Sequence, residues 1–114
     1  MDALLGAAGL DDIGVLFPDD DPAHAGASSV ALLRDVVERV GVAGWVVGNV
    51  DVTVVCERPR LAPYRQAMRT CWAKALGVDE HVVGLKATTT EGMGFEGRGE
   101  GIAASAVCLL RRKE

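Results

Sequence analysis

The sequence predicts an α/β (α+β) fold in which a small mixed β-sheet packs against helices. The chain has 114 residues, of which 49% are hydrophobic and 25% charged, and this composition is typical of one globular domain with its own core. Apolar residues recur at helical spacing in two stretches, and they alternate with polar residues in the stretch 45–56 between them. We therefore expect a single domain, 1–114, with the order helix, helix, strand, helix, strand, strand.

The N-terminal part predicts a short helix followed by an irregular loop. Residues 1–10 are rich in Ala and Leu, Asp2 can cap the helix, and Gly9 marks its end. Two prolines and a run of aspartates in 11–29 favour a loop without regular structure.

Two longer helices follow from stripes of apolar residues. The first is expected to start at Ser28 or Ser29 and to stop at Gly41, and the second to have Pro63 in its first turn and to stop at Gly77. Charged residues, among them Arg65, Arg69 and Lys74 in the second helix, are expected on the opposite faces. The stripes consist of Leu32, Leu33, Val36, Val37 and Val40, and of Leu61, Tyr64, Ala67, Met68, Cys71, Trp72, Ala75 and Leu76.

Three strands complete the expected fold. Alternation in 45–56 predicts a long strand with one buried face, and 82–88 and 102–110 predict two more. The last strand is apolar on both faces, so it should be buried or lie in a subunit interface. The buried face of the first strand is expected to carry Val46, Val50, Val52, Val54 and Cys56, opposite Asn49, Asp51 and Thr53.

Charge and composition exclude several classes of partner. The net charge of −4 and the aromatic content of 4% disfavour nucleic-acid binding. No apolar run reaches membrane-spanning length, and the first residues lack the basic region of a secretory signal. The three cysteines, Cys56, Cys71 and Cys108, form no C-x-x-C motif, and the two histidines, His24 and His81, lie far apart, so the spacing suggests no zinc site. The odd number of cysteines in a small chain favours a reducing compartment.

Residues 88–92, Thr-Thr-Thr-Glu-Gly, are the first candidate site. Hydroxyls and backbone N–H groups suit phosphate oxygens, and the carboxylate of Glu91 can hold Mg²⁺ against those phosphates. The alternative is a strand end that runs into an ordinary turn.

Two further segments are weaker candidates. The carboxylate of Asp12 beside Gly14 can accept ribose or polyol hydroxyls, although an Asx turn explains the same residues. The glycine-rich run 97–101 looks like a phosphate cradle, but it leads into a strand instead of a helix. A buried pair of Arg98 and Glu100 is the alternative there.

Taken together, six segments resemble a known family. They are 2–8 (Asp-Ala-Leu-Leu-Gly-Ala-Ala), 12–14 (Asp-Ile-Gly), 17–19 (Phe-Pro-Asp), 48–53 (Gly-Asn-Val-Asp-Val-Thr), 86–91 (Lys-Ala-Thr-Thr-Thr-Glu) and 97–101 (Gly-Arg-Gly-Glu-Gly). In this order they resemble the 2-C-methyl-D-erythritol 2,4-cyclodiphosphate synthases of non-mevalonate isoprenoid biosynthesis, over essentially the whole chain. No single segment is specific, but the combination is.

The resemblance implies a homotrimeric phosphorus–oxygen lyase with active sites between neighbouring subunits. The implied location is the cytoplasm of a bacterium or the plastid stroma of a eukaryote, and the implied substrate is 4-diphosphocytidyl-2-C-methyl-D-erythritol 2-phosphate. Its own 2-phosphate attacks the β-phosphorus, forms the cyclic diphosphate and expels CMP, so the protein positions groups and neutralises charge.

The resemblance also assigns roles to individual residues. Thr89 and Glu91 would be catalytic, with Glu91 as the ligand of Mg²⁺ (or Mn²⁺) and Ala87, Thr88 and Thr89 at the cytidine and diphosphate. The other matching positions are Asp12 and Gly14 at the ribose, Phe17 and Asp19 near the methylerythritol phosphate, Cys56, Pro59, Arg60, Leu61 and Ala62 in a cytosine pocket built mostly of main chain, and Phe95, Arg98 and Glu100 near the trimer axis, where the family has a channel for an isoprenoid diphosphate.

One departure from the family concerns zinc. Family members carry an Asp-x-His motif on an N-terminal segment and a helix His just before the position of Asp2, and these hold a catalytic Zn²⁺. Neither His24 nor His81 matches those positions, so we expect an N-terminally truncated chain that lacks the zinc ligands and is inactive or nearly so. The alternatives are a non-catalytic trimer that binds a cytidine nucleotide or an isoprenoid diphosphate, and a purely structural trimerisation domain.

Overall fold

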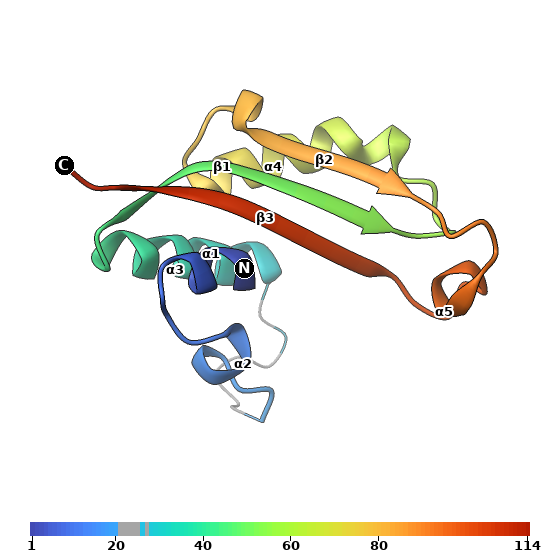
Figure 1. The fold of residues 1–114 in the computed structure, drawn as a ribbon, viewed down its shortest axis with the longest axis horizontal. Coiled ribbons are helices and arrows are strands. Elements are labelled where there is room, and N and C mark those ends of the chain that lie inside the picture. The colour runs from blue at the N-terminus through green and yellow to red at the C-terminus, as the bar shows by residue number, and fades with distance from the viewer. Residues whose placement is uncertain (21–25, 27) are drawn as a thin grey trace.

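A computed structural model of the chain describes residues 1–20, 26 and 28–114. Its sheet has the strand order β2-β1-β3, in which β1 runs parallel to β2 and antiparallel to β3 (Figure 1). The predicted small mixed sheet packed with helices is therefore confirmed. The elements are α1 (Asp2–Ala7), α2 (Ile13–Leu16), α3 (Ser29–Val42), β1 (Trp45–Val55), the 3-10 turn η2 (Ala62–Tyr64), α4 (Arg65–Leu76), the 3-10 turn η3 (Glu80–Val82), β2 (Val83–Thr88), α5 (Gly94–Gly97) and β3 (Ala103–Arg112).

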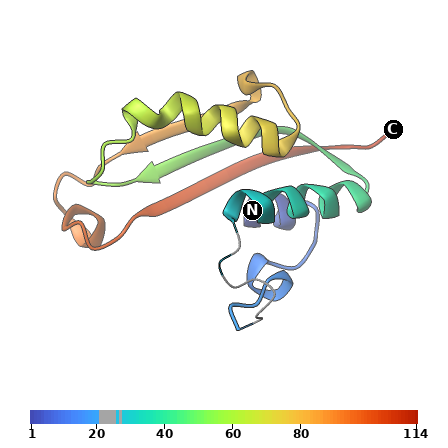
Figure 2. The same ribbon diagram turned by 180° about the vertical axis from the view of Figure 1, so that it is seen from behind.

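The helices α1, α3 and α4 pack on one face of the sheet. Figure 2 shows α4 in front of the strands, and Figure 1 shows the strands in front of α4. Among the described residues no helix covers the opposite face, which carries an ion pair of Asp51 and Lys86 beside exposed Val107 and Leu109. The core joins helices and sheet through Leu4, Leu5, Phe17, Val36, Val40, Val47, Val50, Ala73, Leu76 and Val83.

The expectation that the last strand is buried is wrong for the single chain. Val107 of β3 is 72% exposed and Leu109 is 59% exposed. Over the residues that the structure describes, β3 pairs only with β1, and no element covers the sheet face from which these side chains point. The other expectation for this strand, a subunit interface, stays a prediction.

A bulge in β1 changes which valine is buried. Val47 pairs with Leu110 and Asn49 with Leu109, so the register shifts at Gly48. Val47 is consequently 5% exposed and belongs to the core, whereas simple alternation had placed Val46 there. Gly48 suits this position because an added Cβ would lie 3.0 Å from the carbonyl oxygen of Leu109.

The inward face of α4 is also rotated from the predicted stripe. Ala73, which was not expected inside, is buried with Ala75 and Leu76, whereas Tyr64 and Cys71 are exposed. The position of the sheet against the helix, and not apolar character alone, decides which of these residues are buried. Gly77 ends the helix as predicted, with φ of 71°.

The N-terminal region differs from the sequence prediction at two points. Asp2 does not cap α1; instead its Oδ1 accepts a hydrogen bond of 2.8 Å from the N–H of Ile13. That contact helps to form α2, a single turn inside the stretch that was predicted to lack regular structure.

The first of the two predicted long helices, α3, starts where it was expected but ends slightly later. Ser28 is the N-cap of α3 by position, but its side chain makes no cap hydrogen bond. The helix passes Gly41 and ends at Val42, and the left-handed turn falls on Gly44, with φ of 97°. No helix in the described part of the chain is long and apolar enough to cross a membrane.

The three thiols should differ in reactivity. Cys71 is exposed, Cys56 is buried, and burial raises the pKa of the Cys108 thiol, whose Sγ–H donates to the carbonyl oxygen of Ala3 over 3.2 Å. Since the thiolate is the reactive form, we expect Cys71 to react with a maleimide at pH 7 about tenfold faster than Cys108. Mass spectrometry of the labelled peptides measures this order, and a fast phase that persists in Cys71→Ser would contradict it.

Candidate functional site

The carboxyl ends of β1 and β2 meet at one edge of the sheet. The two strands are parallel, Val55 pairs with Thr88, and the N–H of Cys56 donates to the carbonyl oxygen of Thr88 over 3.0 Å. The loop 56–62 and the segment 88–91 therefore start side by side. Ligands of open α/β sheets bind in this position, beyond the carboxyl ends of the strands.

The loop 56–62 is shaped by contacts of its own main chain. Cys56 is 6% exposed, and its Sγ–H donates to the carbonyl oxygen of Arg58 over 2.9 Å. The Arg58–Pro59 peptide bond is cis, and the loop closes where the N–H of Tyr64 donates to the carbonyl oxygen of Leu61 over 2.9 Å. Pro59, Arg60 and Ala62 of this loop are exposed.

The loop also holds an unsatisfied polar atom. Oε2 of Glu57 is shielded from solvent and has no hydrogen-bond partner within the described residues. A buried acceptor of this kind is costly unless a donor reaches it. Composition and spacing offered no signal for this residue.

The segment 88–91 forms a tight corner after β2. Glu91 has φ of 54°, and its N–H donates to Oγ1 of Thr89 over 3.2 Å, while the hydroxyl of Thr90 donates to the carbonyl oxygen of Met93. The hydroxyl of Thr90 is thus used inside the turn, although the sequence suggested three hydroxyls for a ligand. Thr89 keeps its own hydroxyl proton to donate, and Thr88, Thr89 and Glu91 are all exposed.

Glu91 suits one kind of metal ion better than another. Mg²⁺ is usually held by one or two carboxylates together with substrate phosphates, so a single exposed carboxylate beside hydroxyl donors fits that ion. Zinc needs three or four protein ligands, and the described residues contain no group of three His, Cys, Asp or Glu side chains that could hold a metal.

The two histidines do not change this result. His81 pairs with Asp79 before β2, at the opposite end of that strand from the corner, and the backbone N–H of His81 is the main cause that lowers the pKa of Asp79. His24 lies outside the described residues.

The Asp12 segment forms a capped turn. Oδ1 of Asp12 accepts a hydrogen bond of 3.0 Å from the N–H of Val15 and so caps α2, while the ribose role of Asp12 stays a prediction. A Cβ on Gly14 would lie 3.3 Å from the same oxygen. Phe17 is 6% exposed and is part of the core, with the guanidinium of Arg39 at 5.5 Å from its ring centroid, whereas Asp19 is exposed.

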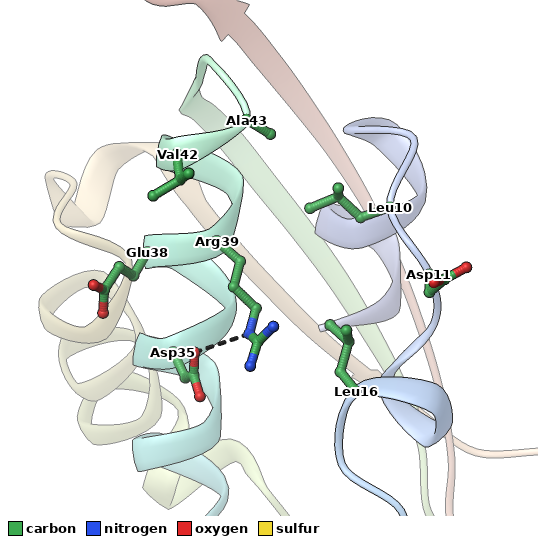
Figure 3. Close-up of a pocket in the computed structure, with 8 residues that line it drawn as sticks. All are labelled: Leu10, Asp11, Leu16, Asp35, Glu38, Arg39, Val42 and Ala43. Atoms are coloured by element: carbon green, nitrogen blue, oxygen red, sulfur yellow. Dashed lines mark hydrogen bonds and ion pairs between the residues drawn. The ribbon is translucent and has the colours of Figure 1, made fainter.

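The two groups of predicted site residues do not come together within one chain. α2 lies beside α3, whereas the corner and α5 lie at the far end of the sheet, and Figures 1 and 2 agree on this separation. A pocket of about 400 Å³ opens between α3 and the α1–α2 segment, but none of the predicted site residues lines it (Figure 3). It is lined by Leu10, Asp11, Leu16, Asp35, Glu38, Arg39, Val42 and Ala43, with Asp35 and Arg39 joined by an ion pair of 3.0 Å.

The tip formed by α5 is exposed and partly apolar. Arg98 and Glu100 form a two-bonded pair, with Nε to Oε1 at 2.7 Å and Nη2 to Oε2 at 3.1 Å, which raises the pKa of Arg98. Both side chains are 58% exposed, so the alternative of a buried pair is wrong. Phe95 is 46% exposed. Met93 and Ile102, on either side of it in the segment 93–102, are exposed as well, and neither was among the predicted site residues.

Comparison with known proteins identifies the family. A model of the YgbB family matches residues 1–111. The chain belongs to the YgbB family. It is 57% identical over 113 residues to the 2-C-methyl-D-erythritol 2,4-cyclodiphosphate synthase of Azoarcus sp. (strain BH72), covering 99% of this chain and 70% of that protein. It is 59% identical over 112 residues to the synthase of Methylococcus capsulatus, covering 98% and 71%.

Solved structures of this family agree with the fold. The bifunctional IspDF of Campylobacter jejuni has a TM-score of 0.93 at 42% identity, covering 97% of this chain and 30% of that one. The IspF of Plasmodium falciparum in a CDP complex has a TM-score of 0.84 at 30% identity, covering 97% and 66%. The chain thus spans about 70% of the first synthase above and 30% of the bifunctional protein. The family and fold inferred from the six segments are confirmed.

The corner depends on a close approach of two glycines. A Cβ on Gly97 would lie 2.2 Å from the carbonyl carbon of Gly92, directly after Glu91, whereas a Cβ on Gly6 in α1 meets nothing within 4 Å. We expect Gly97→Ala to open the segment 92–101 at a cost of about 1–3 kcal/mol, because backbone must move.

Limited proteolysis followed by mass spectrometry measures this opening. Cleavage within 92–101 should be about tenfold faster or more in Gly97→Ala, in line with that cost. Gly6→Ala is the matched control, and it should leave cleavage there unchanged. Equal cleavage rates in Gly97→Ala and the unmodified chain would show that this contact does not support the corner.

Proposed function

We propose that this chain has the function of a 2-C-methyl-D-erythritol 2,4-cyclodiphosphate synthase and that it carries the part that binds cytidine diphosphate and Mg²⁺. The expectation that the chain alone is inactive or nearly so stays a prediction. One observation carries the proposal: in a chain of the YgbB family, the loop 56–62 and the 88–91 corner meet at the carboxyl ends of two parallel strands. Named relatives that are synthases favour the enzyme over a module that only binds nucleotides.

The proposed reaction needs no nucleophile from the protein. An oxygen of the substrate's 2-phosphate forms a bond to the β-phosphorus, and the bond from that phosphorus to the bridging oxygen breaks. The bridging oxygen leaves with CMP, and the cyclic diphosphate remains. Catalysis then consists of holding the 2-phosphate in line with the β-phosphorus and stabilising the charge that develops on the phosphates.

In this proposal the residues at the carboxyl ends of β1 and β2 bind different parts of the substrate. The main chain of the loop that contains Cys56, Pro59, Arg60, Leu61 and Ala62 binds the cytosine, and Ala87 and Thr88 contact the cytidine. Thr89 donates its hydroxyl to the diphosphate. Glu91 holds Mg²⁺ (or Mn²⁺), which when bound neutralises negative charge on the diphosphate.

The remaining predicted residues would act from a neighbouring copy of the chain. Figures 1 and 2 show α2 well apart from the end of the sheet that leads to α5, so Asp12, Gly14, Phe17 and Asp19 around α2 are not expected to share a site with Glu91 in one protomer. We propose a homotrimer in which these residues complete the site across a subunit boundary. The apolar side chains of Val107 and Leu109 on the uncovered sheet face support an assembly, because monomers rarely expose contiguous apolar surface.

Phe95, Arg98 and Glu100 would then lie near the trimer axis. Exposed Phe95, Met93 and Ile102 give this tip the apolar character that an isoprenoid chain needs. The family depends on metal ions in general, and Mg²⁺ at Glu91 is our specific proposal. The described residues do not fit a zinc site, so no step is assigned to zinc. The bacterial relatives are in line with a protein of the cytoplasm.

Glu91→Gln tests the magnesium role. The variant keeps the size of the side chain but removes the charge that binds a divalent cation, so we expect CDP affinity in the presence of Mg²⁺ to fall about tenfold or more. In EDTA the two proteins should bind CDP about equally weakly. Isothermal calorimetry measures both conditions, and Glu38→Gln on the exposed surface of α3 is the control. The proposed function would be overturned if neither Mg²⁺ nor Glu91→Gln changed the affinity for CDP.

A site shared between two copies of the chain predicts that two different variants complement each other when mixed. If Asp12 of a neighbouring copy completes the ribose site, Asp12→Asn should weaken CDP binding several-fold, and mixing Asp12→Asn with Glu91→Gln chains should restore a fraction of intact sites. Calorimetry on the mixture and on each variant alone measures this complementation. A mixture that binds no better than its parents would argue against sites built from two copies.

A further inference from the structure

The outer edge of β2 has an unusual set of partners. The carbonyl oxygen of Thr88 accepts a hydrogen bond from the N–H of Cys56 at the end of β1. The main-chain N–H and C=O groups of successive strand residues point alternately to the two neighbouring sides. Those of Gly84 and Lys86 therefore also point to β1. Val83, Leu85 and Ala87 direct theirs outward. Such an edge normally meets water or another strand.

Two arginines of α4 occupy this edge. Nε of Arg65 donates to the carbonyl oxygen of Leu85 over 2.7 Å, and Nε of Arg69 donates to the carbonyl oxygen of Val83 over 2.9 Å. Nη2 of Arg69 also donates to the carbonyl oxygen of Glu80 over 2.8 Å. All three hydrogen bonds are partly buried and come from a charged donor, which makes them stronger than bonds between neutral groups.

The spacing explains why the two elements fit. Residues four apart on a helix lie about 6 Å apart along its axis, and residues two apart on a strand lie about 6.6 Å apart. The arginines at 65 and 69 therefore match the outward carbonyls at 85 and 83. The next outward carbonyl along β2 is that of Ala87. The residue four positions before Arg65 is Leu61, and its side chain has no hydrogen-bond donor for that carbonyl.

A second contact set fixes α4 against the start of β2. Nε2 of Gln66 donates to Oε2 of Glu80 over 2.9 Å, and Oγ1 of Thr70 donates to Oε1 of Glu80 over 2.7 Å. Nη1 of Arg69 donates to Oε1 of Gln66 over 3.3 Å, so the guanidinium is itself held in place. The helix is thereby fastened to β2 along its edge, in addition to the apolar contacts beneath it.

From these contacts we infer that Arg65 and Arg69 are positioning residues for the corner that follows β2. By binding the outward carbonyls of Leu85 and Val83 they hold the strand in one register against β1, and so they hold Thr88 and Glu91 beside the loop 56–62. They leave the outward main chain of Ala87 open for a ligand. The inference rests on the proposed function in one respect, the identity of the ligand.

Hydrogen exchange of the ligand-free protein tests the positioning itself. Arg65→Met removes the donor, and we expect exchange in peptides covering 85–91 to rise about tenfold, while peptides of α3 and β3 keep their protection. Arg65→Lys keeps a single donor and should show a much smaller rise. Arg34→Met, which changes an exposed arginine on α3, is the matched control and should leave 85–91 unchanged.

CDP affinity supplies the functional readout. With Mg²⁺ present, and at a temperature where circular dichroism shows every variant fully folded, Arg65→Met should bind CDP about five- to tenfold more weakly, and Arg65→Lys should regain most of the affinity.

Unchanged exchange in 85–91 would overturn the inference, and so would an even rise across the whole chain. If Arg65→Met does not fold, Arg65→Lys decides: a rise of two- to threefold confined to 85–91 supports the inference, and no rise refutes it. If the unmodified protein fails to bind CDP, the proposed function fails, while the exchange result still decides the positioning role.

Discussion

The parallel pairing of β1 with β2 is the interaction on which the rest of the arrangement depends. It ends with the hydrogen bond from the N–H of Cys56 to the carbonyl oxygen of Thr88, which places two loops from distant parts of the sequence next to each other. Parallel strands need a crossover element, and α4 fills that role while also binding the outer edge of β2 through Arg65 and Arg69. The position of the candidate site therefore depends on both the strand pairing and the crossover helix.

The second constraint is that the sheet has one covered and one uncovered face. On the uncovered face Asp51 pairs with Lys86 across neighbouring strands, and this pair lies close against Gly84, where an added Cβ would be 2.6 Å from Oδ1 of Asp51. The same face carries exposed valine and leucine side chains of β3. A surface that mixes a cross-strand ion pair with apolar side chains is better suited to contact with another protein surface than to water alone.

The residues predicted for the site are of two different kinds. Cys56 and Phe17 are buried and shape the main chain around them, whereas Glu91, Thr89 and Asp19 are exposed and free to meet a ligand. Rigid support under a few exposed polar groups is the arrangement expected where phosphates must be held in line for a displacement.

The sequence by itself determined the fold class, the approximate extent of every long helix and strand, and the family, because these depend on local periodicity and on short motifs such as 86–91. Only the tertiary structure decided which side of each element is buried. The bulge at Gly48 moves Val47 into the core in place of Val46, and the sheet rather than the apolar pattern selects Ala73 on α4.

The same reason explains the functional residues that were missed. Arg65 and Arg69 were expected only on the face opposite the apolar stripe, yet they bind carbonyls 20 and 14 residues away in sequence. The carboxylate of Asp2 likewise accepts from the N–H of Ile13 in α2 and does not cap its own helix. Partners that are distant in the chain leave no periodic signal in the sequence, since they are chosen by strand register and helix placement.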